Sequence, residues 1–196
     1  MIGILDIGFG NVESVKRSLL ELGVHPLVVA DSLSIFKCSH LIMPGVGEFD
    51  SVISAFHEKD MWNSMVNFLN DPNKKFLGIC IGMQILFEGS EEGVNQGFSI
   101  FKGSLVRLRS NNGHKLPPHM GFREFTSPVS LLSSNRYYYM HSYAIVLSSN
   151  VSGCVNYGGK IIVGFIESNN NWGAQFHPER SGHSGLNFFK DFLSTN

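Results

Sequence analysis

The sequence has few cysteines and almost no net charge. Three cysteines, Cys38, Cys80 and Cys154, lie far apart among 196 residues. An odd number at such spacing excludes a fully paired disulfide framework and offers no paired metal ligands, so at least one thiol stays free. The formal charge of −1 gives no electrostatic reason to expect nucleic acid or an anionic membrane as a partner.

Long apolar runs are also missing. No stretch approaches the roughly 20 residues that cross a bilayer, and the first residues lack the basic start of a signal peptide. We therefore expect a cytoplasmic protein. With 43% hydrophobic residues, 196 residues are enough for one sizeable core and too few for two, which predicts a single domain over residues 1–196.

The first half of the chain alternates short apolar strands with amphipathic helices. Strands are expected at 1–7, 25–30, 40–43 and 75–79, and helices at 11–22, 49–69 and 83–88. This order predicts an α/β fold with a doubly wound, mostly parallel sheet. From residue 103 onward, short runs rich in Tyr, Val and Ile predict an added antiparallel β region. A strand at 172–176 and a helix at 185–193 follow.

Residues 78–82 read Gly-Ile-Cys-Ile-Gly directly after an apolar strand. A nucleophile on a sharp strand-to-helix turn needs a strained backbone, and glycines two positions to either side remove side chains that would collide there. Amides at the start of the following helix favour a thiolate. The alternative is that Cys80 is a small buried core residue, because free cysteine is among the most buried types.

Near the other end of the chain, strand 172–176 runs into His177-Pro178-Glu179. Cysteine chemistry needs an imidazole to move protons and a carboxylate to fix the imidazole tautomer. Pro178 restricts the backbone between the two side chains. A lone histidine is more often structural, but in combination the motifs predict a triad of Cys80, His177 and Glu179.

These motifs, in this order, resemble the class I, triad-type glutamine amidotransferases. Four more segments narrow the resemblance to the glutaminase subunits of imidazole glycerol phosphate synthase. They are residues 6–15, 44–49, 118–121 and 138–143. The resemblance covers nearly the whole chain and implies the class I amidotransferase fold. It implies hydrolysis of L-glutamine without metal or organic cofactor. It also implies a heterodimer with a (β/α)8 cyclase subunit that receives the ammonia in histidine biosynthesis.

The resemblance further assigns roles outside the triad. It implies an oxyanion hole made by the amides of Val46 or Gly47 and of Ile81, glutamine binding by Gly45, Gly47, Gln84, His141, Ser142 and Tyr143, and a partner interface with Asn11, Phe122, Arg123 and Arg180. Plain alternatives stay open: a glycine turn at 44–47, a capping or solvated Gln84, a helix cap at Asn11 and a surface charge at Arg180.

One segment departs from the family pattern. The family commonly has Trp-Asn after Pro-His-Met-Gly, whereas this chain has Phe122-Arg123. A long cation thus replaces a short amide where the partner docks. This departure leaves the triad and segment 44–47 untouched and concerns the partner, so a duplicated subunit that supplies ammonia to a surface-sugar amidotransferase stays open. Two rivals from other classes also stay open: a self-sufficient cysteine hydrolase of γ-glutamyl substrates, and a non-catalytic binding subunit that retains the elbow as a packing motif. We expect most aromatics among Phe122 and 137–139 to lie in the core.

Overall fold

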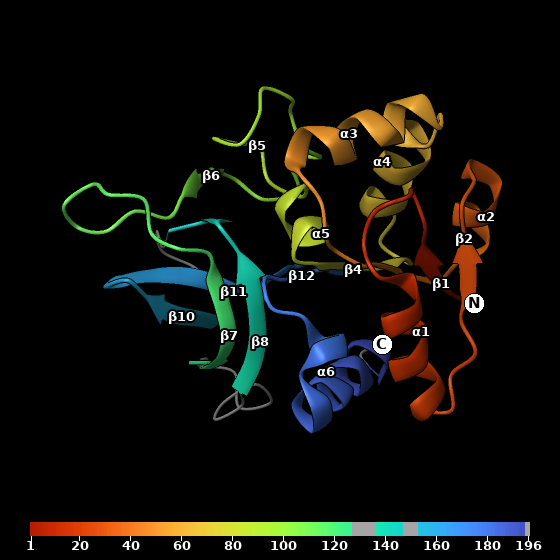
Figure 1. The fold of residues 1–196 in the computed structure, drawn as a ribbon. Helices are drawn as coiled ribbons and strands as arrows, with labels where there is room; N and C mark the ends of the chain where they lie inside the picture. The colour runs from red at the N-terminus through yellow and green to blue at the C-terminus, as the bar shows by residue number, and fades with distance from the viewer. Residues whose placement is uncertain (127–135, 147–152, 195–196) are drawn as a thin grey trace.

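The computed structural model describes residues 1–126, 136–146 and 153–194. Its centre is a seven-stranded sheet in the order β10-β11-β12-β4-β3-β1-β2 (Figure 1). The parallel part comprises β1 (Ile2–Leu5), β2 (Leu27–Val29), β3 (His40–Met43), β4 (Lys75–Ile79) and β12 (Asn171–Ala174), and the antiparallel edge comprises β10 (Gly153–Tyr157) and β11 (Lys160–Ser168). The predicted mostly parallel sheet with an antiparallel addition is confirmed.

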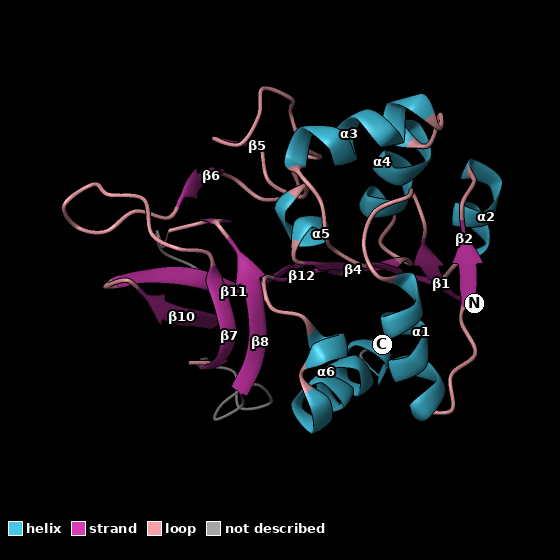
Figure 2. Ribbon diagram, viewed as in Figure 1, coloured by secondary structure: helices cyan, strands magenta, loops and turns pink. Residues whose placement is uncertain are grey.

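Helices cover both faces of the sheet (Figure 2). One face carries α3 (Phe49–Glu58), α4 (Trp62–Asn70) and α5 (Ile81–Gln84), with α2 (Ser32–Lys37) beside α4, and the other carries α1 (Val12–Glu21) and α6 (Gly182–Ser194). Side chains alternate across each strand, so Leu41 and Met43 join the buried cluster under α3 and α4, whereas Ile42 joins the cluster under α1 and α6.

Several helix boundaries differ from the expectation. The helix predicted over 49–69 is two helices, because Asp60 takes a left-handed conformation with φ of 53° and breaks the chain after α3. The helix predicted at 83–88 is the single turn α5, and the closing helix begins at Gly182 rather than at residue 185. Helix α2 was not predicted, because six residues are too few to show a helical period.

A second group of strands lies beside the carboxyl ends of β4 and β12. The hairpin of β7 (His119–Glu124) and β8 (Arg136–His141) is antiparallel, and β5 (Gly89–Ser90), β6 (Ser104–Arg107) and β9 (Tyr143–Ala144) form a small three-stranded sheet. The amide of His177 donates to the carbonyl of Tyr138 at 2.8 Å, which fixes β8 against the chain leaving β12. The hairpin therefore forms one wall of the region beyond those strand ends.

The aromatic residues of the hairpin divide between core and surface. Tyr137 and Tyr139 are buried as predicted, and Tyr138 is half-buried. Phe122 is 44% exposed, so it is the member of this group that lies outside the core, because β7 has one face open to solvent. Within the part of the chain that the structure describes, no helix is both long and apolar enough to cross a membrane.

Candidate active site

Cys80 sits on a strained elbow between β4 and α5. Its φ of 51° and ψ of −104° are unusual for a residue with a side chain, and the residue is 6% exposed. A Cβ added at Gly78 would lie 2.2 Å from the carbonyl oxygen of Gly82, and one at Gly82 would lie 2.8 Å from that of Met43. The two glycines are therefore required for the backbone to pass this closely.

His177 and Glu179 lie just beyond β12, where Pro178 starts the short 3₁₀ helix η1 (Pro178–Arg180). Nδ1 of His177 is 2.8 Å from Oε1 of Glu179, which leaves Nε2 as the nitrogen available to the thiol. Burial lowers the pKa of His177, but the charge and hydrogen bonding of Cys80, together with Glu179, outweigh it and raise that pKa to about 10. The arrangement favours a protonated His177 imidazolium beside the Cys80 sulfur.

Two groups contact the Cys80 sulfur from neighbouring strands. Sγ lies 3.7 Å from the carbonyl oxygen of Met140 on β8, and Nε2 of Gln175 donates to Sγ at 3.6 Å. The carbonyl can accept only from a protonated thiol, whereas the amide N–H stabilises a thiolate. Gln175 was not assigned a role from the sequence. A signal existed, because Gln175 lies only two residues before the predicted catalytic His177, directly after the strand that ends at Ala174.

A cavity of about 160 Å³ opens next to Cys80. Its lining contains all the predicted oxyanion and glutamine-binding residues, which are Gly45, Val46, Gly47, Ile81, Gln84, His141, Ser142 and Tyr143, together with Cys80, Glu92 and Met140. A cavity of this volume has room for several water molecules, so it admits a ligand the size of an amino acid. The structure thus brings these predicted residues into one site.

Glu92 is a lining residue that sequence reasoning missed. Its carboxylate accepts from the amide of Phe49 at 2.9 Å, and burial raises its pKa. It lies in the loop after β5, where no periodic pattern marks it. A carboxylate in this wall is suited to an ammonium group of a ligand.

Gln84 is held tightly and is not a solvated side chain. It is 4% exposed, and its Nε2 donates to the carbonyl of Tyr143 at 3.0 Å and to Oε1 of Gln175 at 3.1 Å. Both amide hydrogens are therefore used inside the protein. Oε1 is the atom left to accept from a ligand, which again suits an ammonium group.

The segment at 44–47 packs directly on the elbow. A Cβ at Gly45 would lie 1.7 Å from the carbonyl oxygen of Ile79, so only glycine fits there. The amide of Gly10 donates to the carbonyl of Val46 at 3.1 Å, which fixes the plane of that peptide. Ile81 is the first residue of α5, so its amide has no acceptor within the helix and is free for an oxyanion.

The predicted interface residues lie outside the cavity. Phe122 packs edge-on to Tyr138 with ring centroids 5.5 Å apart, and the Arg180 guanidinium lies over the Tyr138 ring at 4.5 Å. Arg123 is half-buried on the opposite side of β7 from Phe122, and its guanidinium donates to the Phe122 carbonyl. Asn11 caps α1 by accepting from the Ser14 amide at 3.0 Å.

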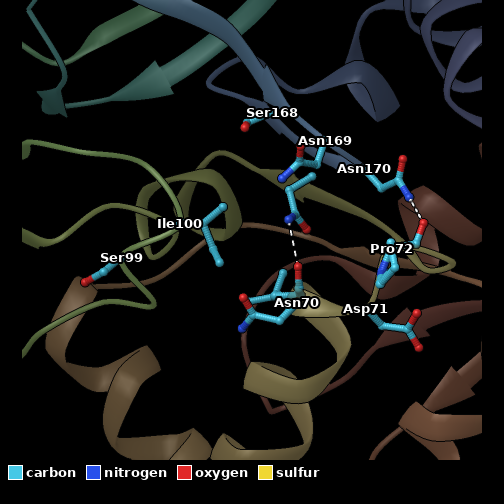
Figure 3. A pocket seen from close by; sticks show the side chains of 10 residues that line it. Asn70, Asp71, Pro72, Ser99, Ile100, Ser168, Asn169 and Asn170 are labelled. Atoms are coloured by element: carbon cyan, nitrogen blue, oxygen red, sulfur yellow. Dashed lines mark hydrogen bonds between the residues drawn. The ribbon is translucent and has the colours of Figure 1, made fainter.

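A wider cavity, of about 490 Å³, lies at the opposite ends of β4 and β12 (Figure 3). Four asparagines line it, and three of their amides have structural partners: Asn171 donates to the Leu69 carbonyl at 2.9 Å, Asn70 to the Val66 carbonyl at 2.8 Å, and Asn170 to the Pro72 carbonyl. The bonds of Asn170 and Asn171 tie the β11–β12 turn to the end of α4. The lining is explained by packing, so the chemistry is assigned to the smaller cavity at Cys80.

Comparison with known proteins agrees with this geometry. Residues 3–195 match the model of the family described as glutamine amidotransferase class-I. The chain is 36% identical over 98% of its length to "Imidazole glycerol phosphate synthase subunit HisH" of Prochlorococcus marinus strain MIT 9312, covering 97% of that protein. It is 38% identical over 98% of its length to the protein of that name in Bacillus anthracis strain CDC 684, covering 93% of it.

The fold is also shared with solved structures. A structure described as a glutamine amidotransferase superposes with a TM-score of 0.78 at 17% sequence identity, covering 98% of this chain and 96% of the other. A chain of PurLQS from Thermotoga maritima superposes with a TM-score of 0.68 at 18% identity, covering 98% and 96% of the two chains. At such identities the likeness concerns the fold. With the family match over residues 3–195, the chain belongs to the class-I glutamine amidotransferases.

Proposed function

We propose that this chain is the glutaminase subunit of an imidazole glycerol phosphate synthase, with residues 1–196 as one amidotransferase domain. The observation that carries the proposal is that Cys80 lines this cavity and interacts with His177, which Glu179 in turn holds by a hydrogen bond of 2.8 Å. Oε1 of Gln84 and the Glu92 carboxylate are suited to the ammonium group of L-glutamine. The names of the relatives at 36% to 38% identity support the histidine pathway over the surface-sugar duplicate.

The reaction follows from the positions of the three side chains. The Cys80 thiolate attacks the side-chain amide carbon of glutamine, forming an S–C bond and a tetrahedral oxyanion. His177 gives its Nε2 proton to the amide nitrogen, the C–N bond breaks, and ammonia leaves a glutamyl thioester. Water then attacks the thioester while His177 takes a water proton, and glutamate leaves as the thiolate is regenerated.

Two backbone segments are available to stabilise the oxyanion. The Ile81 amide is free at the start of α5, and the second donor would come from the Val46 or Gly47 amide. The Gly10 contact holds the Val46 carbonyl in the present orientation. A missing oxyanion donor costs roughly 100-fold in rate. If partner binding rearranged segment 44–47 so that its amide became a donor, the glutaminase would therefore be switched on.

The proposed partner is a (β/α)8 cyclase subunit that takes up the ammonia, with both chains in the cytoplasm. An apolar face on the outer side of β7 and β8 supports docking next to the active site. It is formed by Met120 (52% exposed), Phe122 (44% exposed) and Tyr138, with Arg180 over the tyrosine ring. Met140, on the same face, also lines the catalytic cavity, so a partner docked here would adjoin it.

The test is to measure ammonia release from L-glutamine by the purified chain, alone and with a cyclase subunit carrying its acceptor. We expect slow hydrolysis alone, at least about 100-fold activation by the partner, and no activity in Cys80→Ser at an unchanged melting temperature. Full activity of the isolated chain would instead support a self-sufficient hydrolase. Activity above about a tenth of wild type in Cys80→Ser would exclude Cys80 as the nucleophile.

A further inference from the structure

A buried chain of hydrogen bonds leads from β7 to the Cys80 sulfur. His119 and His141, which face each other in the β7–β8 register, are joined from Nδ1 to Nε2 at 2.9 Å, and Nδ1 of His141 is 2.9 Å from the Tyr143 carbonyl. Gln84 donates to that same carbonyl and to Oε1 of Gln175. Nε2 of Gln175 then donates to Sγ at 3.6 Å.

The direction of every bond in this chain is fixed by one group. The Tyr143 carbonyl can only accept, so His141 carries its proton on Nδ1 and its Nε2 is an acceptor. Nδ1 of His119 must therefore be the donor between the two rings. His119 is fully buried and stacked between Tyr139 and Tyr157, which holds its ring plane. Both histidines are neutral in this arrangement.

The same carbonyl orients the two glutamines. Gln84 must turn its NH₂ group toward Tyr143, and its second hydrogen then requires the oxygen of Gln175. With its oxygen engaged, Gln175 can present only its NH₂ group to sulfur. Gln175 is fully buried, so water does not compete for this contact.

We propose that Gln175 is a further catalytic residue, whose amide donates to the Cys80 thiolate, and that His119 and His141 are positioning residues that hold in place the Tyr143 carbonyl to which Gln84 and, through it, Gln175 are bonded. The proposal rests on the glutaminase function. The hydrogen bond from Gln175 strengthens when the sulfur becomes charged, whereas the contact with the Met140 carbonyl is favourable only for the thiol. Gln175 thus raises the thiolate fraction without taking part in proton transfer.

The experiment measures the pH dependence of Cys80 alkylation by iodoacetamide in the full chain, with the modified peptide resolved by mass spectrometry from those of Cys38 and Cys154. Gln175→Met keeps the length of the side chain and removes the donor. We expect its alkylation midpoint to move up by about one pH unit, which is about a tenfold loss of thiolate at lower pH. The matched control is Gln96→Met, at an exposed glutamine, with an unchanged midpoint.

Other titratable groups around the sulfur are the same in the variants. They are His177 with Glu179 beyond β12, His141 on β8, Tyr143 on β9 and Glu92 in the loop after β5. A second pair of variants tests the positioning residues. His119→Phe should raise the midpoint too, so that the thiolate fraction at lower pH falls about threefold. His119→Asn, whose amide NH₂ group replaces Nδ1–H, should return the midpoint to the wild-type value.

Unchanged midpoints in Gln175→Met would overturn the assignment of Gln175. If His119→Phe and His119→Asn have the same alkylation midpoint, whatever its value, the positioning role of His119 is overturned. Melting temperatures of all variants show whether a shift reflects lost structure, because unfolding around Cys80 would also move the midpoint, toward that of a free thiol. Failure of the proposed function would give a different result: the wild type would show no partner-dependent glutamine turnover, while the alkylation midpoints would still shift as expected.

Discussion

His177 and Glu179 form a hydrogen bond of 2.8 Å between Nδ1 and Oε1, and their side chains are 1% and 4% exposed. Only Pro178 separates them, so both leave the same short turn after β12. The other carboxylate oxygen, Oε2, is buried and has no partner among the described residues. The charge of Glu179 is therefore balanced chiefly by His177, and we infer that the pair acts as one unit.

This relationship predicts a large effect of Glu179→Gln. The amide keeps the size and one acceptor but loses the charge, so the pKa of His177 falls and the imidazolium–thiolate pair weakens. We expect kcat for glutamine hydrolysis by the partner-bound enzyme to fall about 100-fold or more, with little change in KM. Glu167→Gln, at an exposed position on β11, is the matched control. Equal kcat in wild type and Glu179→Gln would refute the orienting role.

Gly45→Ala tests the packing of the oxyanion segment on the elbow. The new Cβ would lie 1.7 Å from the Ile79 carbonyl oxygen, so the two segments must separate. We expect a loss of stability of about 1 to 3 kcal/mol, from overpacking, and at least a tenfold fall in kcat. Urea unfolding and ammonia release measure the two effects. Gly89→Ala, where the nearest atom would be 3.5 Å away, should change neither; similar values for both variants would show that the close approach is unimportant.

Phe122 and Arg123 were both predicted at the partner interface, but strand alternation places them on opposite sides of β7. We expect Phe122→Ala to weaken binding of the cyclase subunit about tenfold, because an exposed aromatic on the docking face loses its burial. Arg123→Asn should change the affinity less than about threefold. Calorimetric titration of each variant with the cyclase decides between them. A larger effect for Arg123→Asn would mean that its guanidinium reaches the partner.

The sequence was sufficient for the parts of the site that are local. Gly78 and Gly82 flank Cys80 at fixed spacing, and the steric reason for that spacing holds in any strand-to-helix elbow. His177 and Glu179 are likewise neighbours in the chain. The parallel sheet followed from the alternation of strands and helices, because each apolar run had the length of one element.

The other parts of the site depend on contacts between residues that are far apart in the sequence. His119 meets His141 only because β7 pairs with β8 in one particular register, and no linear pattern specifies it. Gln84 and Gln175 are 91 residues apart and meet only once β4 and β12 are adjacent. Glu92 reaches the cavity from a loop, where the sequence carries no periodic signal.

The two neutral histidines couple folding to pH. Burial lowers the pKa of His119 to about 4 and that of His141 to about 3, from an ordinary value of 6.5. Between pH 6.5 and about 4 the unfolded chain therefore binds protons that the folded chain does not, so stability falls as the pH falls. His177 acts elsewhere: its pKa is raised to about 10, so it is protonated in both states below pH 6.5, and its contribution is lost only as the pH rises toward 10.

We therefore expect the free energy of unfolding in urea to decrease from pH 7 to pH 5, with each of the two histidines contributing up to about 1.4 kcal/mol per pH unit below pH 6.5. His119→Phe removes one of these groups, so its free energy of unfolding should depend less steeply on pH, even if the variant is less stable at pH 7. The matched control is His183→Phe, which replaces an exposed histidine. Groups that His119 does not influence cancel in this comparison, whereas the pKa of His141, which His119 helps to lower, changes with the substitution and reduces the slope further. If the free energy of unfolding depends on pH equally in the wild type and His119→Phe, then His119 binds protons equally in the folded and unfolded states. The assignment of His119 and His141 as a neutral pair would then be wrong.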